Sequence, residues 1–205
     1  MDLNDLERID LNVLGGADGV TVNDLTGTDL TTVNVNLAGT LGGTVGDTQA
    51  DSVTVFGTNG NDIIDLFGAG TAVSVVGLPA LVNITGAEGA NDALIVNALG
   101  GNDGVTASTL VSGIVKVTID GGTGGDTILG SRGDVVLQGG DGNDFVDGQQ
   151  GNDLIFLGAG DDNFEWNPGD GNDTVEGQDG TDSMTPLQGP GVATSRAFTT
   201  FKGAL

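Results

Sequence analysis

The segment that decides the fold runs from residue 121 to residue 165 and reads GGTGGDTIL, GSRGDVVLQ, GGDGNDFVD, GQQGNDLIF, LGAGDDNFE when it is divided every nine residues. Two more blocks, PGDGNDTVE (168–176) and GQDGTDSMT (177–185), follow an insertion of Trp166 and Asn167. Position four is glycine in every block, position eight is apolar, and position six is aspartate except in the second block, which has Val135. Three positions that recur at one period identify an internal repeat.

Each block predicts a six-residue turn followed by a three-residue strand, because glycine lets the backbone curl and the apolar residue can point inward from a strand. One block cannot bury its single apolar side chain. Two blocks of nine make one coil of 18 residues, and stacked coils bury a narrow row of aliphatic side chains while their strands pair in parallel. The predicted fold class is therefore all-β, a right-handed parallel β-helix or β-roll solenoid.

The blocks resemble the glycine- and aspartate-rich nonapeptide repeat of RTX (hemolysin-type) calcium-binding proteins, GGxGxDxUx, in which U is a large apolar residue. GGTGGDTIL and GGDGNDFVD match this pattern at every defined position. The resemblance implies a β-roll that holds several Ca²⁺ ions between turns on the same edge. The chemistry agrees, because Ca²⁺ takes oxygen ligands from carboxylates and main-chain carbonyls, and glycine-rich turns beside a regular aspartate supply both.

In the family pattern, one turn gives the carbonyl oxygens of positions two and four and its aspartate, and the next turn on that edge gives those of positions one and three and its aspartate. The first site so implied comprises Gly122, Gly124, Asp126, Gly139, Asp141 and Asp144. The second comprises Gly140, Gly142, Asp144, Leu157, Ala159 and Asp162. The match to the family pattern is weaker on the opposite edge. A site there would use Gly148, Gln150 and Asp153, but the preceding turn has Val135 where the pattern has an aspartate. The insertion lengthens the spacing from Asp153 to the next candidate, Asp173, to 20 residues, so the coil must bulge or the roll must end there.

Residues 1–120 lack the nine-residue period, but alternating apolar stretches between Gly, Asn and Asp turns predict strands. Examples are TVNVNL (32–37), SVTVF (52–56) and IVKVTI (114–119). We expect three parts: an irregular parallel β-helix with longer coils over 1–120, the calcium-binding β-roll over 121–185, and a C-terminal tail over 186–205.

Aspartates of the first part are expected to have two roles. GTNGNDIID (57–65) fits most of the nonapeptide and places Asp62 in the metal position, so Asp62 is a further candidate ligand. NVLGGADGVT (12–21) recurs as NALGGNDGVT (97–106). Aspartate is common in turns that bind no metal. The ordinary turn residues that we expect are Asp18, Asp92 and Asp103.

Charge and composition limit the possible functions. The 205 residues include 29 acidic and 5 basic side chains, a net charge of −24, and no cysteine, histidine or tyrosine. The negative charge repels nucleic acids and anionic membranes, and no apolar run reaches the roughly 20 residues of a membrane-spanning helix. Without cysteine there is no disulfide, thiolate nucleophile or cysteine zinc site, and without histidine the usual general base is missing, so we do not expect an enzyme.

Two alternatives to a calcium-binding module stay open. One is a carbohydrate-active parallel β-helix enzyme that uses paired carboxylates such as Asp161 and Asp162. The other is an adhesive or surface-layer spacer segment.

RTX-like proteins generally leave bacteria through a type I secretion channel with an uncleaved C-terminal signal, and the tail over 186–205 occupies that place. A divergent or truncated tail is the alternative. We expect a secreted, extracellular bacterial module, part of a larger exported protein, whose partners are calcium ions and the type I secretion machinery. Self-repulsion should keep the chain extended until Ca²⁺ binds outside the cell and supplies the folding free energy.

Overall fold

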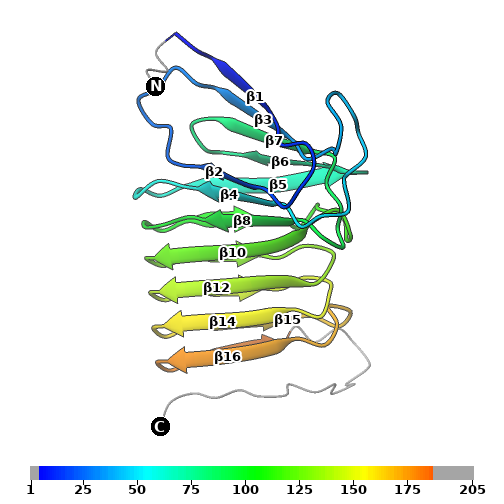
Figure 1. Ribbon diagram of the computed structural model, residues 1–205. Helices are drawn as coiled ribbons and strands as arrows, with labels where there is room; N and C mark the ends of the chain where they lie inside the picture. Colours follow the sequence, from blue (N-terminus) through cyan, green and yellow to red (C-terminus); the bar gives the residue numbers. More distant parts are fainter. Residues whose placement is uncertain (1–4, 187–205) are drawn as a thin grey trace.

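In the computed structural model, residues 5–186 are described, and they consist of strands and turns with no helix among them. The strands form two sheets. Within them the strands lie one above another along a single axis, with the N-terminal strands at one end and the last repeats at the other (Figure 1). The all-β, β-roll class expected from the repeats is confirmed. With no helix, this part of the chain has none that could cross a membrane.

Each coil contributes to both sheets in turn. The ten-stranded sheet has the order β1 (Arg8–Asn12), β3 (Thr32–Asn36), β7 (Leu81–Thr85), β6 (Ala72–Val76), β5 (Ile63–Ala69), β9 (Gly104–Thr106), β11 (Thr127–Leu129), β13 (Phe145–Asp147), β15 (Asn163–Trp166) and β17 (Ser183–Pro186). The seven-stranded sheet has the order β2 (Gly19–Val22), β4 (Ser52–Phe56), β8 (Ala93–Asn97), β10 (Lys116–Thr123), β12 (Val135–Asp141), β14 (Leu154–Ala159) and β16 (Thr174–Asp179).

The coils of the roll stack in the register that the nine-residue period predicts. β10 pairs in parallel with β12 so that Ile119 lies beside Leu137, and β12 pairs with β14 so that Leu137 lies beside Ile155. Equivalent positions of alternate blocks therefore lie side by side, which makes two blocks one coil.

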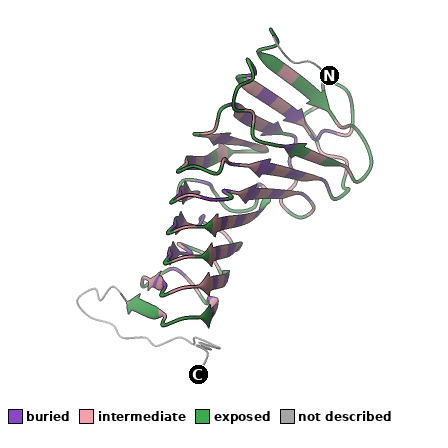
Figure 2. Cartoon of the chain, turned by 90° about the vertical axis from the view of Figure 1, so that its left-hand side faces the viewer, coloured by how far each residue is buried: buried purple, intermediate pink, exposed green. Residues whose placement is uncertain are grey.

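The apolar side chains at position eight fill the space between the sheets. Ile128, Leu137, Val146, Ile155 and Phe164 are all 0% exposed, and Val175 is 2% exposed. Figure 2 shows buried residues alternating with less buried ones along the strands. The seventh member, Met184, is 37% exposed in the last described coil.

Strand β6 is a local exception to the parallel arrangement expected for residues 1–120. It pairs antiparallel with β5 on one side and with β7 on the other. The turn between β5 and β6 consists of Gly70 and Thr71, and Gly70 has a φ of 68°, the left-handed backbone that two-residue hairpin turns require. The GAGT sequence at this turn therefore inserts a hairpin into an otherwise parallel stack.

The insertion at Trp166 and Asn167 makes the coil bulge and does not end the roll. The main-chain N–H of Asp170 donates to the carbonyl oxygen of Asn167, and the Asp170 carboxylate accepts from the Asn167 N–H. After this closed turn, β16 pairs in parallel with β14. The expected C-terminal tail over 186–205 lies outside the described residues apart from Pro186.

The repeated decapeptide forms the same turn on opposite edges of the stack. Residues 12–21 lead from β1 to β2, whereas residues 97–106 lead from β8 to β9, in the reverse direction between the sheets. The φ angles of Leu14 and Leu99 are 63° and 77°, and the glycines two residues later are both at 126°. The local sequence therefore determines this turn whichever sheet it leaves.

Replacing Gly142 with alanine should destabilise the roll strongly. Gly142 has a φ of 141°, and a Cβ there would lie 1.8 Å from the carbonyl oxygen of Gly124, so neighbouring coils would have to separate. Gly169→Ala is the matched control, because Gly169 has a φ of 118° but nothing lies within 4 Å of its would-be Cβ. The control should cost about 1–2 kcal/mol for its backbone alone, and Gly142→Ala clearly more, in urea unfolding with Ca²⁺ present. Equal losses would contradict the close stacking.

Candidate metal centre

The turns of one edge, where the chain passes from the seven-stranded to the ten-stranded sheet, carry an aspartate in every coil from β4 onward. The main-chain N–H of each of these aspartates but the last donates a hydrogen bond to Oδ1 of the aspartate in the next coil, over 2.7 to 3.2 Å. The sequence separations along the row are 41, 23, 18, 18 and 20 residues. We name this row the aspartate ladder. Its members are Asp62, Asp103, Asp126, Asp144, Asp162 and Asp182.

The second carboxylate oxygen of most ladder residues is buried without a hydrogen-bond partner. This holds for Oδ2 of Asp103, Asp126, Asp144, Asp162 and Asp182. The first four of these residues are only 1–3% exposed. A buried charged oxygen without a partner is energetically costly, so five such oxygens in one row indicate that a cation belongs beside them.

Main-chain carbonyl oxygens face the same places as these carboxylate oxygens. A Cβ on Gly121 would lie 2.4 Å from Asp126 Oδ2 and 2.5 Å from the carbonyl oxygen of Gly139. One coil further, a Cβ on Gly139 would lie 2.6 Å from Asp144 Oδ2 and 2.1 Å from the carbonyl oxygen of Leu157. Beside each of these two glycines, an aspartate carboxylate therefore lies close to a carbonyl oxygen of the next coil. The two predicted sites have the same pairs of donors.

The remaining carbonyls of both predicted sites also lie at the contact between coils. The carbonyl oxygens of Gly122 and Gly124 face Gly140 and Gly142, whose Cβ atoms would be 2.0 and 1.8 Å from them. The position-three carbonyls of Asp141 and Ala159 accept hydrogen bonds of 2.7 Å from Gly124 and Gly142. The structure therefore brings the residues of each predicted site on this edge together.

Any metal on the aspartate ladder must draw on main-chain oxygens as well as side chains. Within residues 5–186, no group of three or more acidic side chains is placed to hold an ion by itself. Two carboxylates with several carbonyls form an all-oxygen donor set, which suits a hard cation of six to eight ligands such as Ca²⁺. The donors present fit that ion.

The opposite edge of the roll has a single stacked pair of aspartates. Asp153 donates its N–H to Asp173 Oδ1 over 3.1 Å, and Oδ2 of each is unpartnered. In the preceding coil, Val135 donates its N–H to Asp153 Oδ1, but its own side chain is buried in the core. Gly148 and Gln150 lie in the turn before Asp153 as predicted, yet the site they would complete lacks one carboxylate.

Two aspartates of the N-terminal half have their oxygens satisfied by nearby donors. Asp92 accepts from the N–H groups of Asp51 and Glu88, in agreement with an ordinary turn residue. Asp62, predicted as a further ligand, accepts at Oδ2 from the Thr58 N–H at 2.7 Å and from Thr58 Oγ1 at 3.1 Å. Both oxygens of the Asp62 carboxylate therefore accept hydrogen bonds from Thr58, and neither is buried without a partner.

Asp103 requires a correction. We expected an ordinary turn residue, but Asp103 is a buried member of the aspartate ladder with an unpartnered Oδ2. The signal was in the sequence: ALGGNDGVT (98–106) has glycine at position four, aspartate at six and valine at eight. It was missed because positions one and two are Ala98 and Leu99 rather than glycines.

The acid pair considered for catalysis does not form a shared site. Asp162 is 1% exposed and accepts the Asp144 N–H within the ladder. Asp161 is exposed, and its carboxylate accepts the N–H of Thr181 at 2.8 Å. Paired catalytic carboxylates must flank one substrate bond, whereas here one side chain is buried and the other is exposed.

Burial raises the pKa of four ladder carboxyls, those of Asp103, Asp126, Asp144 and Asp162. The pKa of Asp144 is raised to about 6, mainly by loss of solvent and further by the neighbouring Asp126 and Asp162, although the hydrogen bond from the Asp126 N–H opposes the shift. Burial likewise raises the pKa of Asp153, to about 8. Without a cation, the raised pKa therefore keeps Asp153 largely protonated at neutral pH, whereas Asp144 takes up its proton as the pH falls through about 6.

Stacked glycine turns, paired carboxylates and convergent carbonyls define a metal-binding β-roll. The family model of the RTX calcium-binding nonapeptide repeat (4 copies) matches residues 120–155, 136–164 and 169–190. This segment of the chain therefore carries RTX calcium-binding repeats, as the resemblance predicted. No curated protein matches the chain. The matched repeat is a structural calcium-binding module.

Asp144 is shared by both predicted sites of the first edge, so Asp144→Asn should lower the number of bound Ca²⁺ ions by more than one in calorimetric titration. The matched control is Asp141→Asn, three residues away in the same turn. Its exposed side chain is not part of the predicted site, which uses only its carbonyl oxygen. Unchanged stoichiometry in Asp144→Asn would show that the site register is wrong.

Calcium affinity should fall as the pH is lowered from 8 to 5. The raised pKa values of Asp144 and Asp153 mean that the metal-free fold holds protons which the ion must displace. In the same window the metal-free folded state binds more protons than the unfolded chain, so its free energy of unfolding should rise as the pH falls. Circular dichroism of calcium-stripped protein should thus show more β-structure at pH 5 than at pH 8, and the reverse trend would contradict the assignment.

Proposed function

We propose that this chain is a secreted bacterial calcium-binding module, part of a larger exported protein, that folds when Ca²⁺ binds outside the cell. The observation that carries the proposal is the row of buried carboxylate oxygens without partners on the aspartate ladder. Such a row is unfavourable in a folded chain until a cation is present.

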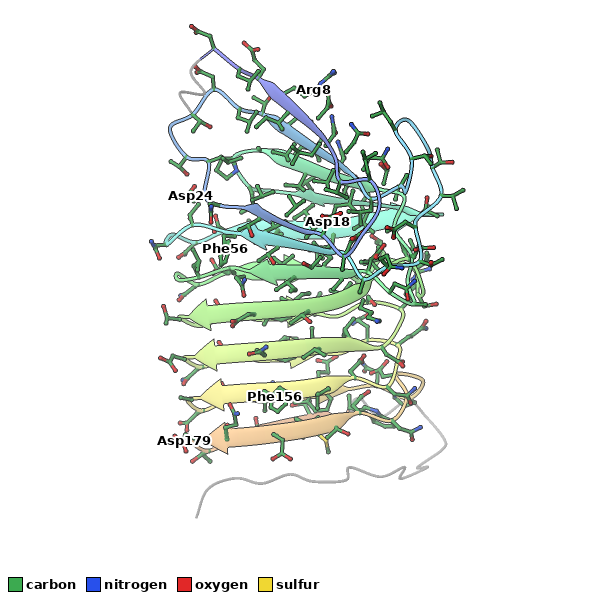
Figure 3. The ribbon with its side chains drawn as sticks, in the orientation of Figure 1. Arg8, Asp18, Asp24, Phe56, Phe156 and Asp179 are labelled. Atoms are coloured by element: carbon green, nitrogen blue, oxygen red, sulfur yellow. The ribbon has the colours of Figure 1, made fainter. Side chains whose placement is uncertain are left out.

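The chain has almost no positive charge of its own with which to neutralise this row. It has 5 basic residues against 29 acidic ones. Among residues 5–186, the one ion pair joins Arg8 to Asp10 at the N-terminal end (Figure 3), and both side chains are largely exposed. The charge of the roll is therefore neutralised by bound cations or, at lower pH, by protons on the buried carboxyls.

The coupling of calcium to folding follows from where the donors come from. Each predicted site takes oxygens from two turns that are 18 residues apart, so no site is complete in the unfolded chain. Binding free energy then becomes folding free energy. At a tenfold excess of Ca²⁺ over the dissociation constant, each site would add about 1.4 kcal/mol to stability.

This coupling supports export in an unfolded form. Extracellular calcium modules have dissociation constants of about 10⁻⁴–10⁻³ M, so the sites would be empty at cytosolic calcium and filled outside. An extended chain suits passage through the type I secretion machinery, which we propose as a partner.

Circular dichroism with and without calcium tests the folding switch. In about 5 mM Ca²⁺, a concentration above the expected dissociation constants, the spectrum should show β-structure, and in excess EGTA most of that signal should be lost. Mg²⁺ at the same concentration is the control and should not restore it, because Mg²⁺ needs a smaller, more rigid octahedral site. A β-signal of equal strength in EGTA would refute folding on binding, while calorimetry would still report whether calcium binds.

A further inference from the structure

The turn at residues 98–103 stacks on the turn at 121–126 in the same way as two consensus repeats stack on each other. A Cβ on Gly124 would lie 1.6 Å from the carbonyl oxygen of Gly101, compared with 1.8 Å for Gly142 and Gly124. At position two, a Cβ on Gly122 would be 2.0 Å from the carbonyl oxygen of Leu99, the same distance as in the next coil.

The hydrogen bonds between these two turns repeat as well. Gly101 donates its N–H to the carbonyl oxygen of Thr123 over 2.9 Å, as Gly124 does to Asp141 over 2.7 Å. Asp103 donates its N–H to Asp126 Oδ1 over 2.8 Å, the distance found between Asp126 and Asp144. The backbone arrangement of a consensus site is therefore already present one coil before the first complete repeat.

The carboxylates of this contact lack a partner. Asp103 and Asp126 are 3% and 2% exposed, and Oδ2 of each accepts no hydrogen bond. Position one holds Ala98 instead of glycine, with its methyl group in the core. A non-glycine residue at position one is compatible with the repeat geometry, because a matched repeat has the equally buried Leu157 there. In that repeat Oδ2 of Asp162 is likewise buried without a partner.

We propose that a further Ca²⁺ ion binds between the turns at 98–103 and 121–126, which extends the calcium-binding row one coil beyond the matched repeats. The proposal rests on calcium binding by the roll. Both carboxylates of the site are buried, and the carbonyl oxygens of Leu99, Gly101 and Thr123 lie at the contact between the two turns. The donors are the carboxylates of Asp103 and Asp126 and the carbonyl oxygens of Leu99, Gly101, Gly121 and Thr123.

The row of ions ends at this coil, because the preceding turn is closed by its own side chains. The N–H and Oγ1 of Thr58 both donate to Asp62, and Gly60 donates its N–H to Thr58 Oγ1 instead of to the next coil. Both oxygens of the Asp62 carboxylate therefore have hydrogen-bond donors within the protein. Thr58 takes the place that a metal ion has in the later turns.

Counting bound calcium in two conservative variants tests the proposal. In Asp103→Asn the amide oxygen can still accept the Asp62 N–H, but an NH₂ group replaces the free oxygen, so the variant should bind one ion fewer than the unmodified chain at saturating Ca²⁺. Asp62→Asn is the matched control and should bind the full number. Equilibrium dialysis followed by elemental analysis gives the count, and circular dichroism verifies that each variant folds.

The outcomes separate this site from calcium binding as such. If the unmodified chain bound no calcium, the proposed function itself would fail. If it bound calcium and Asp103→Asn bound the same number of ions, only the additional site would be overturned, and loss of an ion in Asp62→Asn would overturn the assigned end of the row. Should Asp103→Asn not fold, crystals of the unmodified chain grown with Ca²⁺ decide the question. An anomalous calcium peak between Asp103 and Asp126 is expected, and its absence refutes the site.

Discussion

The hydrogen bond from the main-chain N–H of one ladder aspartate to Oδ1 of the next is the interaction on which the roll depends. It repeats from Asp62 to Asp182, and it fixes both the register of the coils and the orientation of each carboxylate. With Oδ1 held by the neighbouring backbone, Oδ2 is turned into the interior, where no donor is available. The bond that aligns the coils thus also creates the negatively charged interior that a cation must neutralise, so structure and metal binding share one cause.

The period of nine residues made the roll predictable because each defined position has one physical task. The apolar residue at position eight packs in the core, and the aspartate at position six belongs to the aspartate ladder. Glycines such as Gly124 and Gly142 lie where a neighbouring coil is too close for a Cβ. The turns that carry both predicted sites on this edge stack on each other, and the set of metal ligands stays a prediction. The bulge at Trp166 and Asn167 was left open in the prediction, since spacing alone cannot say whether a longer turn closes; the bonds between Asn167 and Asp170 close it.

The N-terminal half was less predictable, because its coils vary in length. The alternation of apolar and polar residues predicts the strand positions. The antiparallel placement of β6 depends instead on a two-residue turn at Gly70, which is too short to show in a repeat pattern. Similarly, Asp62 fits the nonapeptide better than Asp103 does, yet Thr58 satisfies Asp62 while Asp103 is left unpartnered. A consensus match measures likeness to the repeat, whereas the need for metal depends on whether a neighbouring side chain can donate.

The chemistry of asparagine and aspartate explains why some rows of stacked polar side chains satisfy their own hydrogen bonds and others do not. An asparagine both donates and accepts, so a row of asparagines can satisfy itself: Asn83 donates to Asn34, which donates to Asp10. An ionised aspartate only accepts, so a row of aspartates leaves oxygens without partners unless another group donates to them, as Thr58 does to Asp62. The asparagine row lies on strands β3 and β7, whereas the aspartate ladder lies in turns where aspartate stacks on aspartate. From Asp103 to Asp182 no donor reaches Oδ2, so the need for a cation in those turns follows from the lack of a donor and not from the repeat pattern itself.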